Sequence, residues 1–187
     1  MTDPLIACVL GGTAPGARVE LHDIAFAVGP SLEAVYPQLL DSWFGHAHGL
    51  HVDAWTVLDR VEGYRVRLER TPADNGLHLY FVNIGGYRKG EFGERHAWGF
   101  FGAHSKSEAK ERAKQSLLQG HELPHKDDLY DVDDCLQVGR IQGWHVHLEP
   151  DAEAHTAPVT NGYFPLPSAV VREWLARRDA RETPTSP

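Results

Sequence analysis

The chain repeats itself, and this internal similarity constrains the fold more than any single motif does. When the sequence is shifted by 74 positions against itself, residues 10–59 align with 84–133 without a gap, and eleven of the fifty positions are identical. The aligned identities include Gly11 with Gly85, Glu20 with Glu94, His22 with His96, Ser31 with Ser105, His51 with His125 and Asp53 with Asp127. After Asp133 the second copy has six extra residues, and 63–69 then aligns with 143–149. We therefore predict two diverged copies of one unit.

Each copy has the same predicted order of elements. The apolar runs at 5–10 and 79–84 predict first strands that end in a Gly-Gly turn, and each is followed by a predicted hairpin partner, at 19–28 and 94–101. A helix comes next. It starts after Ser31 in the first copy, where Pro37 should kink it or delay its start, and after a Ser105–Glu108 capping box in the second copy.

A second hairpin, at about 51–61 and 64–69 in the first copy, closes each unit. Alternating apolar residues at 64, 66 and 68, and again at 144, 146 and 148, predict strands with one buried face. The unit is thus ββαββ.

The predicted fold is α+β. It is a tandem pseudo-twofold duplication of a ββαββ unit, with mainly antiparallel sheets, helices packed on one face and a C-terminal helix. One unit is small for an independent core, so the two copies are expected to pack as a pseudo-dimer. The predicted domains are a first repeat at 1–70, a second repeat at 77–150 and an extension at 151–187, whose helix spans about 168–181 and whose last residues are expected to be disordered.

Charge and composition narrow the class of protein. The formal net charge of −8 argues against general affinity for nucleic acid or an anionic membrane. No apolar stretch is long enough to span a bilayer, and the N-terminus reads as a strand and not as a signal peptide. The two cysteines have no paired spacing, so neither a disulfide framework nor a thiolate zinc site is indicated. A cytoplasmic protein is the expectation.

Several motifs together resemble a known family. They are Leu-Gly-Gly at 10–12, Glu-x-His-Asp at 20–23, Trp-Phe-Gly at 43–45, His-x-Asp at 51–53 and Gly-Tyr at 63–64, with Phe-Val-Asn at 81–83 and His-Lys-Asp-Asp at 125–128 in the second copy. This pattern resembles an uncharacterised bacterial family catalogued as domain of unknown function 1543, over about residues 5–149. In that family the domain occurs in one or two copies. The resemblance implies two tandem copies here and brings no activity, cofactor or catalytic residue with it.

The polar residues that the two copies share form candidate ligand sets. Residues two apart on a strand point to the same face, so each Glu-x-His pair and each His-x-Asp pair presents its side chains together. Two imidazoles and two carboxylates suit Zn²⁺, Mn²⁺ or Fe²⁺ or a small ligand, and they could also form an acid–base pair in which a carboxylate tunes a histidine. The candidate site residues are Glu20, His22, His51 and Asp53 in the first copy, and Glu94, His96, His125 and Asp127 in the second. Equally, these residues could cap turns and bond to the backbone, as fold determinants.

Two other functions stay open at this level. The aromatic residues Trp43, Phe44, Trp55, Trp98 and Trp144, with the C-terminal helix, could present an apolar face to a protein partner or to a second copy of the chain. The basic second helix, with Lys106, Lys110, Arg112 and Lys114, could bind phosphate or nucleic acid. The sequence does not decide whether the protein is an enzyme.

Overall fold

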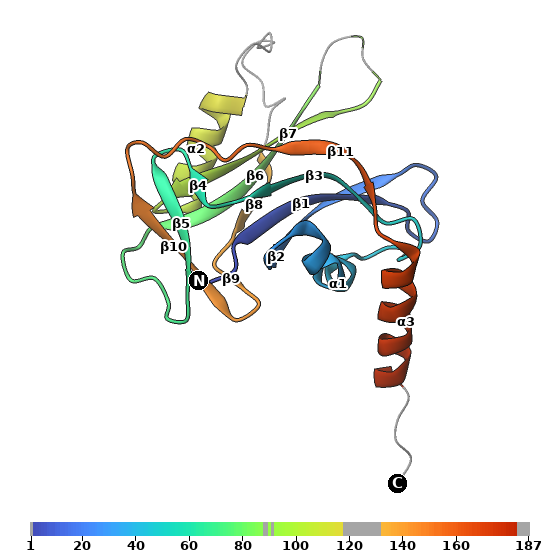
Figure 1. Ribbon diagram of the computed structural model, residues 1–187. Helices are drawn as coiled ribbons and strands as arrows, with labels where there is room; N and C mark the ends of the chain where they lie inside the picture. Colours follow the sequence, from blue (N-terminus) through green and yellow to red (C-terminus); the bar gives the residue numbers. More distant parts are fainter. Residues whose placement is uncertain (1, 88–89, 91, 118–131, 183–187) are drawn as a thin grey trace. The chain divides into compact units, whose positions relative to one another are not determined.

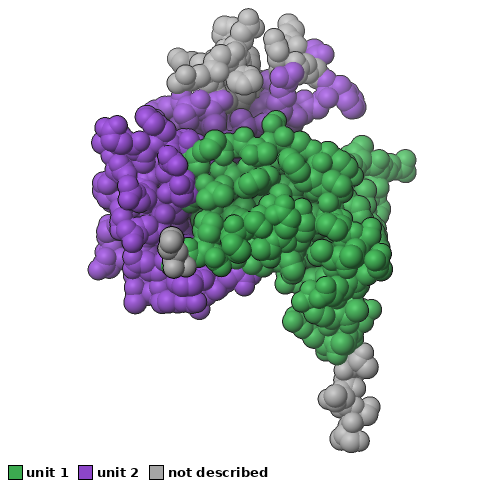
Figure 2. Space-filling model, viewed as in Figure 1, with its two compact units in different colours: residues 1–58, 157–187 green, residues 59–156 purple. Residues whose placement is uncertain are grey.

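A computed structural model describes residues 2–87, 90, 92–117 and 132–182 (Figure 1). The chain forms two compact units, one of residues 1–58 with 157–187 and one of residues 59–156 (Figure 2). The first unit contains β1 (Leu5–Gly12), β2 (Leu21–Val28), α1 (Leu32–Ser42), β3 (His51–Val57), β11 (Thr160–Pro165) and α3 (Ser168–Glu182). The second contains β4 (Arg60–Val61), β5 (Tyr64–Glu69), β6 (His78–Gly86), β7 (Arg95–Ala103), α2 (Lys106–Leu117), β8 (Val132–Gln137), β9 (Arg140–Ile141) and β10 (Trp144–Pro150).

The first unit is one antiparallel sheet with two helices. Its strand order is β11-β3-β1-β2, so the last strand of the chain extends the sheet beside β3. Alternate residues of the strands, such as Leu10 in β1, Ala25 in β2 and Val52 in β3, lie in one apolar core together with buried residues of α1 and α3. Because side chains alternate across a strand, the residues between them, such as Gly11 and His51, belong to the other face of the sheet.

Local signals explain where the first helix begins. The Ser31 side chain accepts a hydrogen bond from the Ala34 backbone N–H at 3.3 Å, which is the predicted N-cap. The helix starts at Leu32, five residues before Pro37, so Pro37 does not delay its start. In α2, Ser105 accepts from the Glu108 N–H at 3.1 Å, and the Glu108 carboxylate accepts in return from His104, one residue before the predicted position.

Burial in the first core makes Cys8 of β1 unreactive. Its side chain is fully buried, and the resulting loss of solvation raises the pKa of this thiol to about 12. Because thiol reagents attack the thiolate, iodoacetamide at about pH 8 should leave Cys8 unmodified in the folded protein and label it after unfolding in urea. Peptide mass spectrometry checks this expectation. Equal labelling rates in the two states would contradict the packing of β1.

The second unit contains two antiparallel sheets. In the sheet β7-β6-β8, alternate residues such as Val82 and Ile84 pack against Ala109 and Ala113 of α2. In the other sheet, β4-β5-β10-β9, the strand β5 from the first predicted repeat pairs with β10 from the second. This pairing gives the alternating apolar residues of both strands one common face, on which Val66 and Leu148 are buried.

The α+β class, the antiparallel sheets and the C-terminal helix are confirmed. The second hairpin is shorter than predicted: its turn at residues 62–63 is present, but only the two-residue strand β4 pairs with β5 across it, because β3 ends at Val57, and β10 pairs with the other edge of β5. The compact units also divide at 58/59, whereas the predicted repeats divide at 71–76. The Gly-Gly pairs are the last two residues of β1 and β6 and are paired strand residues, not turns. The expected disordered end, 183–187, lies outside the described residues.

Candidate metal centre

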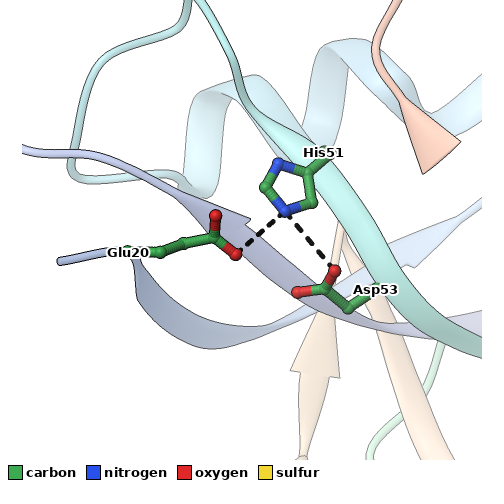
Figure 3. A group of neighbouring side chains, drawn as sticks. All are labelled: Glu20, His51 and Asp53. Atoms are coloured by element: carbon green, nitrogen blue, oxygen red, sulfur yellow. Dashed lines mark hydrogen bonds and ion pairs between the residues drawn. The ribbon is translucent and has the colours of Figure 1, made fainter. Parts of the chain in front are cut away.

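Four side chains predicted as ligands in the first copy converge in the first unit. Glu20 precedes β2, His22 lies on β2, and His51 and Asp53 lie on β3. Ligand atoms of Glu20, His51 and Asp53 all lie within 4.8 Å of one another (Figure 3). We call these four residues, Glu20, His22, His51 and Asp53, the quartet.

The contacts within the quartet run between imidazole nitrogens and carboxylate oxygens. His51 Nε2 is 3.2 Å from Glu20 Oε1 and 3.4 Å from Asp53 Oδ1. His22 Nε2 is 3.2 Å from Glu20 Oε1 and 3.1 Å from Asp53 Oδ2. Glu20, His51 and Asp53 thus enclose one small volume on the sheet face opposite α1, and His22 contacts both carboxylates but is not part of that three-residue group.

Gly11 makes room for this arrangement. In the register of the sheet Gly11 lies between His22 on β2 and His51 on β3. A Cβ atom at position 11 would lie 2.4 Å from His51 Nε2 and 2.5 Å from Asp53 Oδ2. Any other residue here would occupy the space into which the quartet points.

The pairing of β3 is irregular at Asp53 against both of its neighbouring strands, β1 and β11. Against β1 the register jumps from Val9↔Ala54 to Leu10↔Val52, which leaves Asp53 as the extra residue of a β-bulge. Against β11 the register jumps from Asn161↔Ala54 to Phe164↔Val52, so residues 162 and 163 oppose Asp53. Bulges commonly redirect a side chain beside a functional site.

His51 is buried and held in one orientation. Its side chain is 5% exposed, and Nδ1 lies 3.0 Å from the Gly49 carbonyl oxygen. A carbonyl oxygen only accepts, so Nδ1 carries the proton and donates it. In the neutral ring, Nε2 then holds a lone pair that faces the oxygens of Glu20 and Asp53. This is the orientation of a metal-ligating histidine, whose other nitrogen donates to a carbonyl or carboxylate.

Within the described residues, one carboxylate oxygen of Asp53 lacks a hydrogen bond. Oδ2 is buried and, among the described residues, accepts none, although His22 Nε2 is close to it. A buried carboxylate oxygen normally has a donor or a cation as its partner. Lone pairs and anionic oxygens facing each other across the quartet repel unless a cation lies between them or an imidazole is protonated.

The predicted second copy is described only in part. His96 Nε2 lies 3.9 Å from Glu94 Oε2, a longer contact than the 3.2 Å between His22 Nε2 and Glu20 Oε1. His125 and Asp127 lie outside the described residues. The register from Asn83↔Asp134 to Ile84↔Val132 makes Asp133 the extra residue of a bulge in β8. The backbone therefore matches Asp53 with Asp133 rather than with Asp127.

The remaining predicted features are spread over both units. Trp43 is buried, and its ring centroid lies 4.6 Å from that of Phe44, which is exposed. Trp55, Trp98 and Trp144 are half-buried, and the Arg70 guanidinium covers the ring of Trp144. In α2, Arg112 donates to the Gly102 carbonyl, while Lys106 is exposed. None of the three helices in the described part of the chain combines the length and hydropathy of a membrane span.

The sequence analysis named the four residues of the quartet and missed the residues that surround them. Gly11 was visible only as a shared glycine, and its role as space for His51 requires the register of three strands. The Gly49 carbonyl belongs to a glycine with φ of +84°, a conformation that side chains disfavour. Tyr163, whose ring centroid lies 4.6 Å from that of His51, comes from a segment outside both predicted repeats.

Comparisons with known proteins agree with this fold. Residues 17–68, which include the whole quartet, match the model of a family described as Domain of Unknown Function (DUF1543). Among solved structures, protein Il1583 from Idiomarina loihiensis is 37% identical; the match covers 88% of this chain and 98% of that chain, with a TM-score of 0.68. No curated protein matches the chain. With a solved relative this similar over nearly its whole length, and the family's own model matched across the quartet, the chain belongs to the DUF1543 family.

Proposed function

We propose that this protein binds one divalent transition-metal ion through the quartet in its first unit. The observation that carries the proposal is the orientation of His51. Its Nδ1–H is committed to Gly49 O, and its Nε2 faces two carboxylates from inside the fold. The unsatisfied, buried Oδ2 of Asp53 supports the same conclusion from the other side of the site.

The ligand types limit which ions fit. Imidazole nitrogen with carboxylate oxygen suits Zn²⁺, Mn²⁺ and Fe²⁺, whereas all-oxygen sites suit Ca²⁺ and Mg²⁺. Two carboxylates balance the charge of a divalent ion, so the loaded site is close to neutral. Four protein ligands fill a tetrahedral zinc site and leave positions open on an ion that prefers six ligands.

A titration with matched histidine variants tests the proposal. Untagged protein should bind one equivalent of Co²⁺, Zn²⁺ or Mn²⁺ in isothermal titration calorimetry. His51→Gln should weaken binding more than about 100-fold, because loss of an outer partner alone costs about 10- to 100-fold. His48→Gln, which changes an exposed histidine of the same unit, should bind as wild type does.

Two results would count against the proposal. The first is heat of binding that His51→Gln leaves unchanged, which would place the ion elsewhere. The second is the absence of stoichiometric binding by any of the three ions. In that case the quartet is held by protonated histidine and the shared residues are determinants of the fold.

We also propose that the chain is a duplicated DUF1543 unit. β2 and β7 start 74 residues apart, at 21 and 95, as do α1 and α2, at 32 and 106; β4 and β9 start 80 apart, at 60 and 140, as do β5 and β10, at 64 and 144. The β5–β10 pairing is reciprocal under the shift of 80: Val66↔Leu148 mirrors Leu68↔Val146 about Arg67↔His147. A pseudo-twofold axis produces this kind of self-complementary contact.

A further inference from the structure

The strand that follows both repeats adds an aromatic wall to the quartet. Tyr163 lies in the bulge of β11 opposite Asp53, and its ring centroid is 4.6 Å from that of His51, with the planes inclined by 49°. Its neighbour Phe164 packs against the core on the other face of the sheet. The bulge therefore separates the two aromatic side chains, sending one inward and one to the metal centre.

Tyr163 is exposed although it touches a buried residue. It is 68% exposed, and the described part of the chain gives it no hydrogen bond or ion pair. The contact with His51 covers only part of the Tyr163 ring. An exposed aromatic surface beside polar ligand groups can supply contact area for a bound molecule.

The quartet is also open on one side. The side chains of Glu20 and His22 are 47% and 45% exposed, whereas His51 lies beneath them at 5%. An ion bound by these four groups would contact the protein on the side of the sheet and solvent on the opposite side. Ions that prefer six ligands would keep exchangeable positions on that outer side.

We propose that the metal centre takes a small anionic chelator that carries a flat ring, and that Tyr163 is the specificity-determining residue that recognises the ring. The inference rests on the proposed metal ion. A bidentate ligand with one carboxylate would fill two open positions, and an aromatic ring attached to it would reach the exposed side of Tyr163. Offset or edge-on aromatic contacts of this kind favour a ring over an aliphatic group.

Charge fits a monoanion better than a larger anion. The loaded quartet is close to neutral, and its ligand groups are two carboxylates and two imidazoles, without a lysine or arginine among them. Affinity therefore has to come from the bond to the metal and from the ring contact. A polyphosphate or a nucleic acid would find no cationic group in the quartet to hold it.

Two chelators that differ in the ring test this inference on Co²⁺-loaded protein. Picolinate and glycinate both chelate through one nitrogen and one carboxylate oxygen, and only picolinate is aromatic. Binding is followed by the visible absorption of Co²⁺, and retained cobalt is measured after gel filtration. Tyr163→Ala should weaken picolinate about 3- to 10-fold and leave glycinate unchanged, since an aromatic pair contributes modestly. Tyr163→Phe, which keeps the ring, should retain the wild-type preference.

The outcomes separate this inference from the proposed metal binding. Wild type and all Tyr163 variants should bind Co²⁺ equally well, because Tyr163 is not a ligand. If Co²⁺ binds but picolinate fails to join it, strips it from the protein, or loses nothing in Tyr163→Ala, the chelator inference is overturned and metal binding stands. If Co²⁺ does not bind to the wild type, both fail.

Discussion

Asp53→Asn is expected to abolish metal binding and to leave the metal-free protein at least as stable as wild type. The asparagine has the same shape, but it removes the negative charge that a cation needs. Its loss from the quartet should weaken Co²⁺ binding more than about 100-fold, beyond the effect of losing an outer partner. In the metal-free protein the same change removes repulsion between two carboxylates that share one site, so the free energy of unfolding should not fall.

The free energy of unfolding of Asp53→Asn distinguishes a binding site from a structural ion pair. If Asp53 serves to hold protonated His22 or His51, Asp53→Asn costs about 1.5–3 kcal/mol, as for other hydrogen bonds to charged groups. Urea unfolding in the presence of EDTA measures this difference. Asp23→Asn is the control, because Asp23 lies on β2 of the same sheet and, in the described part of the chain, accepts only from the Ile24 N–H, which an amide oxygen can also do. A large stability loss in Asp53→Asn alone would contradict the account.

Gly11→Ala should remove the site by filling it. The new Cβ would lie 2.4 Å from His51 Nε2 and 2.5 Å from Asp53 Oδ2, so both side chains must move. Gly11 does not have a positive φ, and alanine is therefore compatible with its backbone. We expect metal binding to be lost and the free energy of unfolding to fall by about 1–3 kcal/mol, as for other overpacked positions.

Calorimetry and urea unfolding check the effect of Gly11→Ala against Gly139→Ala. At Gly139 the nearest atom to an added Cβ is Gln137 Nε2 at 3.6 Å, an ordinary contact, and φ is not positive. The control should match wild type in both measurements. Unchanged metal affinity in Gly11→Ala would show that the ion does not bind against β1.

Local periodicity was enough to predict the two residue pairs of the candidate site, but not that they meet. A spacing of two on a strand places Glu20 beside His22 and His51 beside Asp53, and the sequence shows both pairs twice. The two pairs meet because of Gly11 in β1. This glycine lies between His22 on β2 and His51 on β3, and it has no side chain to fill the space between them. Tyr163 was beyond reach, because a strand returning from the C-terminus to pair with β3 has no local signal.

The pairing of β5 with β10 shows a second limit of prediction from sequence. Alternation at Val66 and Leu68 correctly predicted a strand with one buried face, but periodicity does not name the partner strand. Pairing with β10 sets Val66 opposite Leu148 and Leu68 opposite Val146, which the sequence could only suggest through the repeat. If the chain is a duplicated unit, the bulge at Asp133 matches Asp53 at an offset of 80, so the six extra residues would precede β8, whereas the ungapped alignment placed them after Asp133.

Anomalous diffraction from crystals of untagged protein grown with Mn²⁺, Zn²⁺ or Co²⁺ tests the central claim most directly. The account predicts one element-specific peak per chain in the quartet, about 2.0–2.2 Å from His51 Nε2 and an Asp53 carboxylate oxygen, as in known sites. The His51 Nδ1–H should still donate to the Gly49 carbonyl. A quartet without a peak, in which protonated His22 and His51 bond directly to Glu20 and Asp53, would contradict it.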